Sequence, residues 1–180
     1  MISCTLGPLA KCSARELIRV KADRTTAWAI VGAQEPRFFP LIFLTGDNAP
    51  FVINVVLDPG DFERYPVAKY GTDYRFVHDP TGPSQIGDDE LSRTAGSLVL
   101  TEDGEWHLLV NDYNRKGAIR WLHLASGKVV GERGSHKIAF ADWSLCIKGL
   151  THEPSEATLL SHATWTDAAD DDDSHWTGST

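Results

Sequence analysis

Two apolar runs that meet at an Asp-Gly pair constrain the fold more than any other part of this sequence. The stretch SLVLTEDGEWHLLV places this pair, residues 103–104, between two strand-like segments. Asp-Gly favours a two-residue type I′ turn, because both central residues of that turn need positive φ angles. The pair therefore predicts an antiparallel hairpin whose register sets Glu102 opposite Glu105 and Thr101 opposite Trp106. Facing glutamates oppose such pairing only mildly.

Further runs extend this hairpin into a larger antiparallel arrangement. FPLIFLT and FVINVVLD are separated by the turn residues GDNAP, and AIRWLHLASGKVVGE bends at a Ser-Gly pair, residues 126–127. KIAFADWSLCIKG predicts a later strand. EATLLSHATWT predicts one more, although its Leu159, Leu160 and Ala163 would also suit a helix. From residue 97 onward the connections are too short for parallel crossovers. The sequence predicts a mainly β fold, with α+β as the alternative: an antiparallel meander that forms a barrel-like or sandwich domain.

Three segments carry helix signals, so we expect one to three short helices beside the strands. Residues 13–16, SARE, match a capping box, and the helix that they predict continues through LIRVKA. LIRVKA also alternates as in a strand, so both interpretations stay open there. Residues 58–66 and 88–95 each begin with an aspartate cap and predict a helix of no more than two turns.

Chain length and composition indicate a single domain. A chain of 180 residues, 42% of them hydrophobic, can bury a core of its own. The segment 79–90 is rich in Pro, Gly, Ser and Asp, which predicts a long loop and offers a place for a lobe boundary. We predict one β-rich domain over residues 1–166 and an acidic C-terminal tail over residues 167–180. The three cysteines are scattered, which predicts unpaired thiols rather than a disulfide framework.

The charge of the chain is negative and uneven. The net charge is −8. Residues 38–114 contain four Lys/Arg and thirteen Asp/Glu, a net −9, and the tail contains five aspartates and no Lys or Arg. Between them, residues 115–137 contain six Lys/Arg and one glutamate, a net +5. Surplus negative charge favours basic partners and disfavours nucleic acid and anionic membranes.

From this charge we predict a non-catalytic protein-binding module that docks on another protein with a basic surface. Inhibitor or immunity-type proteins fit this size and charge. Acidic side chains would steer such a partner, and an exposed tryptophan would anchor it. The expected contact residues are Asp170, Asp171, Asp172, Asp173 and Trp176 in the tail, and Glu102, Asp103 and Glu105 in the hairpin. A further hypothesis is that the tail docks on the basic stretch 115–137, with Trp176 as its anchor.

Two other functions stay open. The first is an enzyme or small-ligand binder that acts on an anionic substrate near residues 115–137. The second is a structural or assembly component. The candidate anion-binding residues are Arg115, Lys116, Arg120 and His123.

Recognisable catalytic motifs are absent from the sequence. It contains no Walker loop, no GxGxxG and no HExxH. We therefore predict no catalytic residue, no cofactor and no metal site. No signal peptide and no long apolar span are visible, so we expect a soluble, cytoplasmic protein that does not enter membranes.

Overall fold

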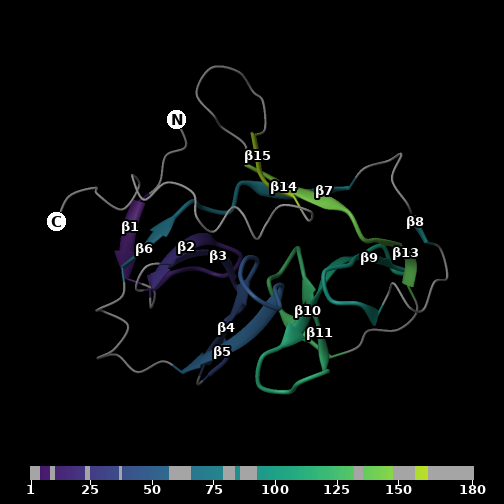
Figure 1. The fold of residues 1–180 in the computed structure, drawn as a ribbon, viewed down its shortest axis with the longest axis horizontal. Helices are drawn as coiled ribbons and strands as arrows, with labels where there is room; N and C mark the ends of the chain where they lie inside the picture. Colours follow the sequence, from purple (N-terminus) through teal and green to yellow (C-terminus); the bar gives the residue numbers. More distant parts are fainter. Residues whose placement is uncertain are drawn as a thin grey trace.

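The chain folds into two β-sheets (Figure 1). The computed structural model describes residues 5–8, 11–22, 25–36, 38–56, 66–78, 84–85, 93–131, 136–147 and 157–161. The larger sheet contains β1 (Thr5–Pro8), β2 (Leu17–Ala22), β3 (Thr25–Val31), β4 (Phe38–Phe43), β5 (Phe51–Val56), β6 (Pro66–Lys69), β8 (Ser84–Gln85), β9 (Leu98–Thr101), β10 (Trp106–Asp112), β11 (Ile119–His123), β12 (Val129–Val130) and β13 (His136–Phe140). The smaller sheet contains β7 (Tyr74–His78), β14 (Trp143–Ile147) and β15 (Ala157–Ser161).

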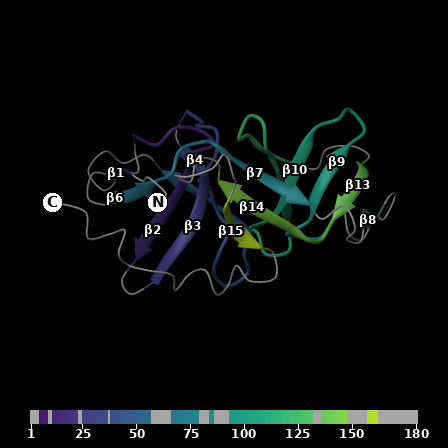
Figure 2. The same ribbon diagram turned by 90° about the horizontal axis from the view of Figure 1, so that it is seen from above.

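The larger sheet is open. Its strand order is β1-β6-β2-β3-β4-β5-β10-β9-β13-β8, with β11 and β12 branching from β10. The two ends are different strands, so the described strands do not close into a barrel. The smaller sheet, in the order β15-β14-β7, lies over one face of the larger one in a sandwich-like arrangement (Figure 1, Figure 2). The predicted mainly β class is confirmed, and the sandwich is the one of the two predicted architectures that fits.

Strand β10 joins the two halves of the larger sheet. On one edge, the first residues of β10 pair antiparallel with β9, where Trp106 lies opposite Leu100. On the same edge, the last two residues of β10 pair in parallel with β5, where Asn111 lies opposite Phe51. The other edge of β10 pairs with β11. The predicted meander is confirmed for β9 to β12, which are antiparallel in sequence order, whereas β13 returns to pair with β9.

The main core fills the space between the two sheets. Alternate residues of the central strands point into it, and side chains of β7 and β14 cover it from the other side. Burying each large apolar side chain contributes about 1.5–3 kcal/mol to stability. The buried members of this core are Leu17, Trp28, Ile30, Ile42, Leu44, Val52, Ala68, Tyr70, Leu98, Leu108, Val110, Leu122, Phe140, Trp143 and Leu145.

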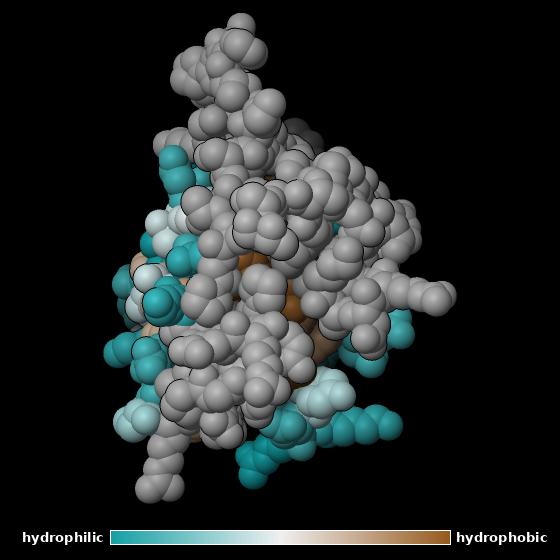
Figure 3. Space-filling view, turned by 90° about the vertical axis from the view of Figure 1, so that its left-hand side faces the viewer, coloured by the Kyte–Doolittle hydropathy of each residue, from teal (hydrophilic) through white to brown (hydrophobic). Residues whose placement is uncertain are grey.

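The opposite face of the larger sheet carries two smaller apolar clusters. One comprises Ile18, Ala29, Val31, Leu41 and Val67, and the other Val99, Leu109, Trp121 and Ala139. Both sets alternate with members of the main core, because successive side chains of a strand point to opposite faces. On the side of the molecule that carries β1 and β6, hydrophobic residues are visible near the centre and hydrophilic residues along the margin (Figure 3). The larger sheet is therefore apolar on both faces.

The predicted helix over residues 13–22 is wrong. The Ser13 N–H donates to Glu16 Oε2 at 2.9 Å, so one half of the capping box forms. Arg15, however, has a φ of 69°, in the left-handed region, which is incompatible with a helix at this position. Residues 17–22 form β2, which pairs with β3 on one edge and with β6 on the other. Two strand partners outweigh a local capping signal, whose contribution is only about 1 kcal/mol.

The part of the chain that the structure describes contains no α-helix. The helix predicted for residues 58–66 lies outside the described residues except for Pro66, which begins β6. The one predicted for residues 88–95 lies outside them up to residue 92, and residues 93–96 form turns. The same described ranges hold no helix that is long and apolar enough to cross a membrane. Within these ranges Cys12 and Cys146 are not joined in a disulfide, and Cys4 lies outside them.

The Asp-Gly hairpin forms, but its predicted register is wrong by one residue. Thr101 lies opposite Glu105 rather than Trp106, across a three-residue loop. The Thr101 N–H donates to the Glu105 carbonyl at 3.0 Å, and the Gly104 N–H donates to the Thr101 carbonyl at 3.0 Å. In this loop Gly104 alone is left-handed, with a φ of 84°, as a three-residue loop requires. A shift of one residue reverses the faces, so Glu105 shares a face with Thr101 and does not oppose Glu102.

Candidate functional site

A cleft of about 470 Å³ lies between the hairpin tips of the larger sheet and strand β7 of the smaller one. Its lining is mostly aromatic and aliphatic with a few polar groups, and its volume is within the roughly 300–1,000 Å³ typical of small-molecule sites. It is therefore the candidate functional site. The larger sheet contributes Leu98, Gly104, Glu105, Trp106, Leu124 and Ala125, the smaller sheet contributes Tyr74, Arg75, Phe76 and His78, and the turn before β2 contributes Arg15.

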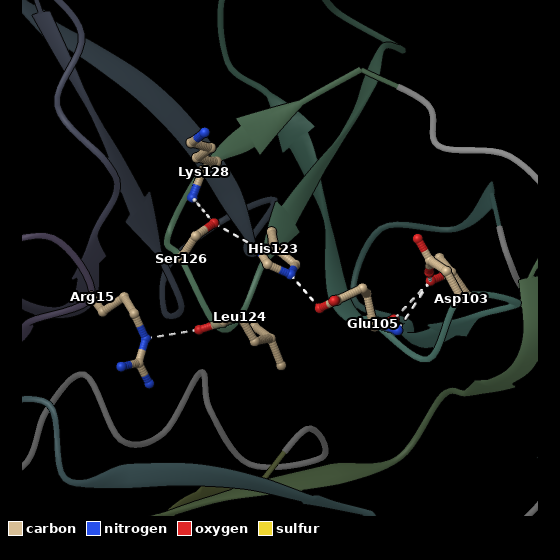
Figure 4. Close-up of polar contacts among 8 residues, drawn as sticks. Arg15, Asp103, Glu105, His123, Leu124, Ser126 and Lys128 are labelled. Carbon is tan, nitrogen blue, oxygen red and sulfur yellow. Dashed lines mark hydrogen bonds and ion pairs between the residues drawn. The ribbon is translucent and has the colours of Figure 1, made fainter.

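Arg15 is held firmly at the edge of this cleft. Its Nε–H donates to the Leu124 carbonyl at 2.8 Å, although the two residues are 109 positions apart (Figure 4). The Arg15 carbonyl accepts the Tyr74 hydroxyl at 2.6 Å, and the guanidinium carbon lies 6.0 Å from the centre of the Tyr74 ring. Burial raises the pKa of the Tyr74 hydroxyl well above its usual value, although nearby Arg15 lowers it, so the hydroxyl remains a donor.

The terminal nitrogens of Arg15 are uncommitted. Among the described residues they form no hydrogen bond and no ion pair. In the close-up they extend away from Leu124 (Figure 4). The Nε–H bond and the Tyr74 ring restrict the side chain before any ligand arrives. A ligand that binds these nitrogens therefore gains charge-assisted hydrogen bonds without first ordering a free arginine.

Ring contacts fix the aromatic wall of the cleft. Phe76 packs edge-on against Trp143, with ring centres 4.9 Å apart. His78 stacks on Phe140 at 4.2 Å and on Trp106 at 5.4 Å. Such contacts hold ring orientations and leave few rotamers open to the side chains. The wall is therefore largely formed before a ligand binds.

Positive charge outweighs negative charge in the lining. Arg15 and Arg75 are permanently charged, and Glu105 is the only acid among the lining residues that the structure describes. The Glu105 carboxylate is already engaged, since its Oε2 lies 2.6 Å from His123 Nε2. The cleft consequently favours an anionic group.

A chain of three hydrogen-bonded side chains begins at Glu105, which lines the cleft (Figure 4). Glu105 Oε2 lies 2.6 Å from His123 Nε2, and His123 Nδ1 lies 2.6 Å from Ser126 Oγ. An ionised carboxylate can only accept, so Nε2 of the neutral ring holds the proton and Nδ1 accepts the serine hydroxyl. Ser126 Oγ also accepts the Lys128 N–H at 3.2 Å, which leaves its own proton for Nδ1. Glu105 thereby sets the tautomer of His123 and the direction of the Ser126 hydroxyl.

The backbone and the ring that carry this chain of side chains are braced. The buried Thr101 bonds the Asp103 carboxylate through Oγ1, which also accepts the Glu105 N–H at 3.3 Å. Behind His123, the buried ring of His107 packs with its centre 5.1 Å away. Glu105 and His123 are therefore positioned by a buried threonine and a buried histidine.

Of the predicted protein-binding residues, those of the hairpin are described and those of the tail are not. Glu102 and Asp103 are exposed in the loop, where Asp103 turns back to Thr101. Glu105 is half-buried and bonds His123. Outside the described residues lie Asp170, Asp171, Asp172, Asp173 and Trp176, and with them the hypothesis of a docked tail.

The four candidate anion-binding residues do not converge. Arg115 and Lys116 are exposed in the loop before β11, at the end of that strand remote from His123. Arg120 is half-buried and lies on the opposite face of β11 from His123, because the two are an odd number of positions apart. His123 alone among them bonds a residue that lines the cleft, Glu105.

Sequence reasoning did not find most of the cleft. Arg15 stood in a predicted helix, and the aromatic residues of β7 belonged to no predicted site. Ser126 was a turn residue only. The one available signal was the spacing of His123 and Ser126, which are three positions apart on either side of a predicted bend and can therefore meet.

No protein family, curated protein or solved structure shows a significant match to this chain. Among the described residues, no three His, Cys, Asp or Glu side chains gather as metal ligands would. The interpretation of the cleft therefore depends on its own geometry.

Proposed function

We propose that the cleft binds a small molecule with an anionic group on a planar, apolar body. The observation that carries this proposal is the state of Arg15, which is fixed at the edge of an apolar cleft with its terminal nitrogens uncommitted. A guanidinium offers two parallel donors that match a carboxylate, phosphate or sulfonate. Arg75 adds a second positive charge to the same lining.

The remaining lining favours a ring system as the body of the ligand. Phe76, Trp106 and His78 provide aromatic surface, and Leu98 and Leu124 provide aliphatic surface. Planar rings stack on aromatic side chains and bury much apolar area at little entropic cost. A volume of about 470 Å³ supports a drug-sized ligand rather than a polymer.

The protein-binding function, in its inhibitor or immunity-type form, stays a prediction. Its main support is the acidic tail and the charge of residues 38–114. A basic partner protein recruited by that charge would bind less tightly as salt rises, because surface attraction is screened. Occupation of the cleft by a small anion does not depend on such a partner, so the two functions are compatible.

The test is a fluorescence titration with anilinonaphthalene sulfonate, an anionic aromatic probe, and with phenylnaphthylamine, its neutral relative. Wild-type protein should bind the sulfonate more tightly than the neutral probe. Arg15→Gly removes the guanidinium, and glycine accepts the left-handed φ of this position without strain. Loss of charge-assisted bonds of about 1.5–3 kcal/mol should weaken sulfonate binding about 10- to 100-fold and leave the neutral probe nearly unaffected.

Arg115→Ala is the matched control, because Arg115 is exposed and remote from the cleft. It removes the same charge from the protein and should bind both probes like the wild type. The proposal is wrong if Arg15→Gly and Arg115→Ala weaken sulfonate binding equally. It is also wrong if wild-type protein binds the neutral probe as tightly as the sulfonate.

A further inference from the structure

Ligand binding makes no use of the Ser126–His123–Glu105 chain of side chains. This chain contains a hydroxyl, a base that accepts the hydroxyl proton, and a carboxylate that orients the base. These are the parts of an activated nucleophile. The Ser126–His123 and His123–Glu105 distances are both 2.6 Å, at the short end of the hydrogen-bond range usual for such groups. The ring is reversed relative to serine proteases, in which Nε2 faces the serine. Either ring nitrogen is a base once the other holds the proton.

Ser126 is accessible to a small substrate from solvent. Ser126 itself is only partly buried, and Ala125, which precedes it directly, is exposed. His123 and Glu105 are partly open too, with 20% and 44% of their side-chain surface exposed. A small ester can therefore present its carbonyl carbon at this turn.

The same turn contains donors for a developing oxyanion. Within the described residues, the backbone N–H groups of Ala125 and Ser126 donate no hydrogen bond. Oxyanion holes are built from such N–H groups, and the nucleophile's own is often one of them.

We propose that Ser126 is a catalytic nucleophile that hydrolyses small esters at this turn. Ser126 Oγ attacks the carbonyl carbon while its proton passes to His123 Nδ1. The bond to the leaving alcohol breaks, and the alcohol takes that proton. Water then gives a proton to Nδ1, attacks the acyl-serine and releases the carboxylic acid, while Ser126 Oγ recovers the proton. Glu105 is a positioning residue, because it acts through His123.

This activity goes beyond ligand binding and is independent of it, since it requires neither an anionic substrate nor Arg15. The experiment uses the full chain and an organofluorophosphonate probe. Ser126 Oγ forms a bond to phosphorus, fluoride leaves, and His123 takes the serine proton. Peptide mass mapping of the wild-type protein should find the adduct on Ser126, and labelling should abolish hydrolysis of nitrophenyl acetate.

Variants separate catalysis from structure. Loss of the base in His123→Gln should slow labelling about 100-fold or more. Glu105→Gln should slow it less, and Glu105→Asp, which keeps a carboxylate, should restore part of the rate. A purely structural role for Glu105 would change the unfolding midpoint and leave the labelling rate of the folded protein unchanged. Ser13→Ala, at another exposed serine, should label like the wild type.

The proposal is overturned if Ser126 of the wild-type protein carries no adduct while trypsin in the same tube is fully labelled. Equal labelling rates for wild type and His123→Gln overturn it as well, because Ser126 would then not be activated. Neither result affects the binding of anilinonaphthalene sulfonate, so failure of this proposal is distinguishable from failure of the anion-binding function.

Discussion

The two hairpin turns that border the cleft resemble each other in sequence and differ in what holds them. Gly104 and Gly127 both take left-handed φ angles, 84° and 77°. The Gly104 turn is held by its own neighbours, through bonds of Thr101 within the hairpin. The Gly127 turn is held from far away: its carbonyl accepts the Ala33 N–H at 2.8 Å, and the Arg15 side chain packs against it.

This difference shows that a turn signal identifies a bend but not its tertiary role. A Cβ added to Gly127 would meet Arg15 Cγ at 3.1 Å, whereas one added to Gly104 meets no described heavy atom within 4 Å. The first turn is therefore held mainly by bonds within its own hairpin. The second is a joint between residues near the N-terminus and the border of the cleft.

The largest effect that we expect is that of Gly127→Ala. Backbone strain of about 1–2 kcal/mol adds to the cost of displacing Arg15, about 1–3 kcal/mol. The free energy of unfolding should fall by about 2–5 kcal/mol, measured by urea denaturation. If Gly127→Ala lowers the free energy of unfolding no more than Gly104→Ala does, the contact with Arg15 has no energetic role. The two turns would then not differ in the way described.

Gly104→Ala should have a smaller effect on stability. The added methyl group meets open space, so only backbone strain of about 1–2 kcal/mol remains. Gly104→Asn should cost less than Gly104→Ala, because asparagine tolerates the left-handed region better. Denaturant curves for the two variants test this order. If Gly104→Asn is less stable than Gly104→Ala, backbone strain is not the reason that this turn contains glycine.

The smallest effect concerns reactivity rather than stability. Cys12 lies three residues before Arg15, and burial, then Glu16, raises the pKa of its thiol to about 11 despite nearby Lys69. At pH 8 its alkylation should be about 100-fold slower than that of an ordinary cysteine, and the rate should rise tenfold per pH unit until the pH approaches this pKa. Peptide-level mass spectrometry with iodoacetamide measures the rate at Cys12 separately from the other cysteines.

Cys12 also sharpens the comparison of the two turns. Gly127→Ala should speed its alkylation, because displacement of Arg15 loosens the turn that follows Cys12. Gly104→Ala should leave the rate unchanged. The same acceleration in both variants would show that the two turns are not energetically separate.

Local patterns predicted the strands well and their register poorly. The turn residues between β4 and β5, and between β11 and β12, correctly placed two hairpins. Asp103-Gly104 placed a third but suggested a two-residue loop, where Gly104 alone is left-handed. Thr101 decides this point, because its hydroxyl bonds both Asp103 and Glu105 and so stabilises the longer loop. Sequence pattern alone does not compare such competing bonds.

The candidate site was less predictable than the fold. Glu105 and His123 were named for different reasons, one as a partner contact and the other as an anion site, and their 2.6 Å contact depends on the corrected register. Arg15 became part of the site only because β2 is a strand and not a helix. The role of a charged residue depends on which distant backbone it meets, and hydrophobic periodicity contains no information on that point.

The sequence by itself determined the class of this protein: alternating apolar runs and glycine-containing turns are local features, and they specify antiparallel strands through the sterics of a few neighbouring residues. Only the tertiary structure decided where chemistry is concentrated. Residues 15, 74, 105 and 126 come together because the two sheets pack around one core, and burial of that core is a property of the whole chain. Side chains that are distant in sequence acquire a shared environment only when that burial fixes their backbones.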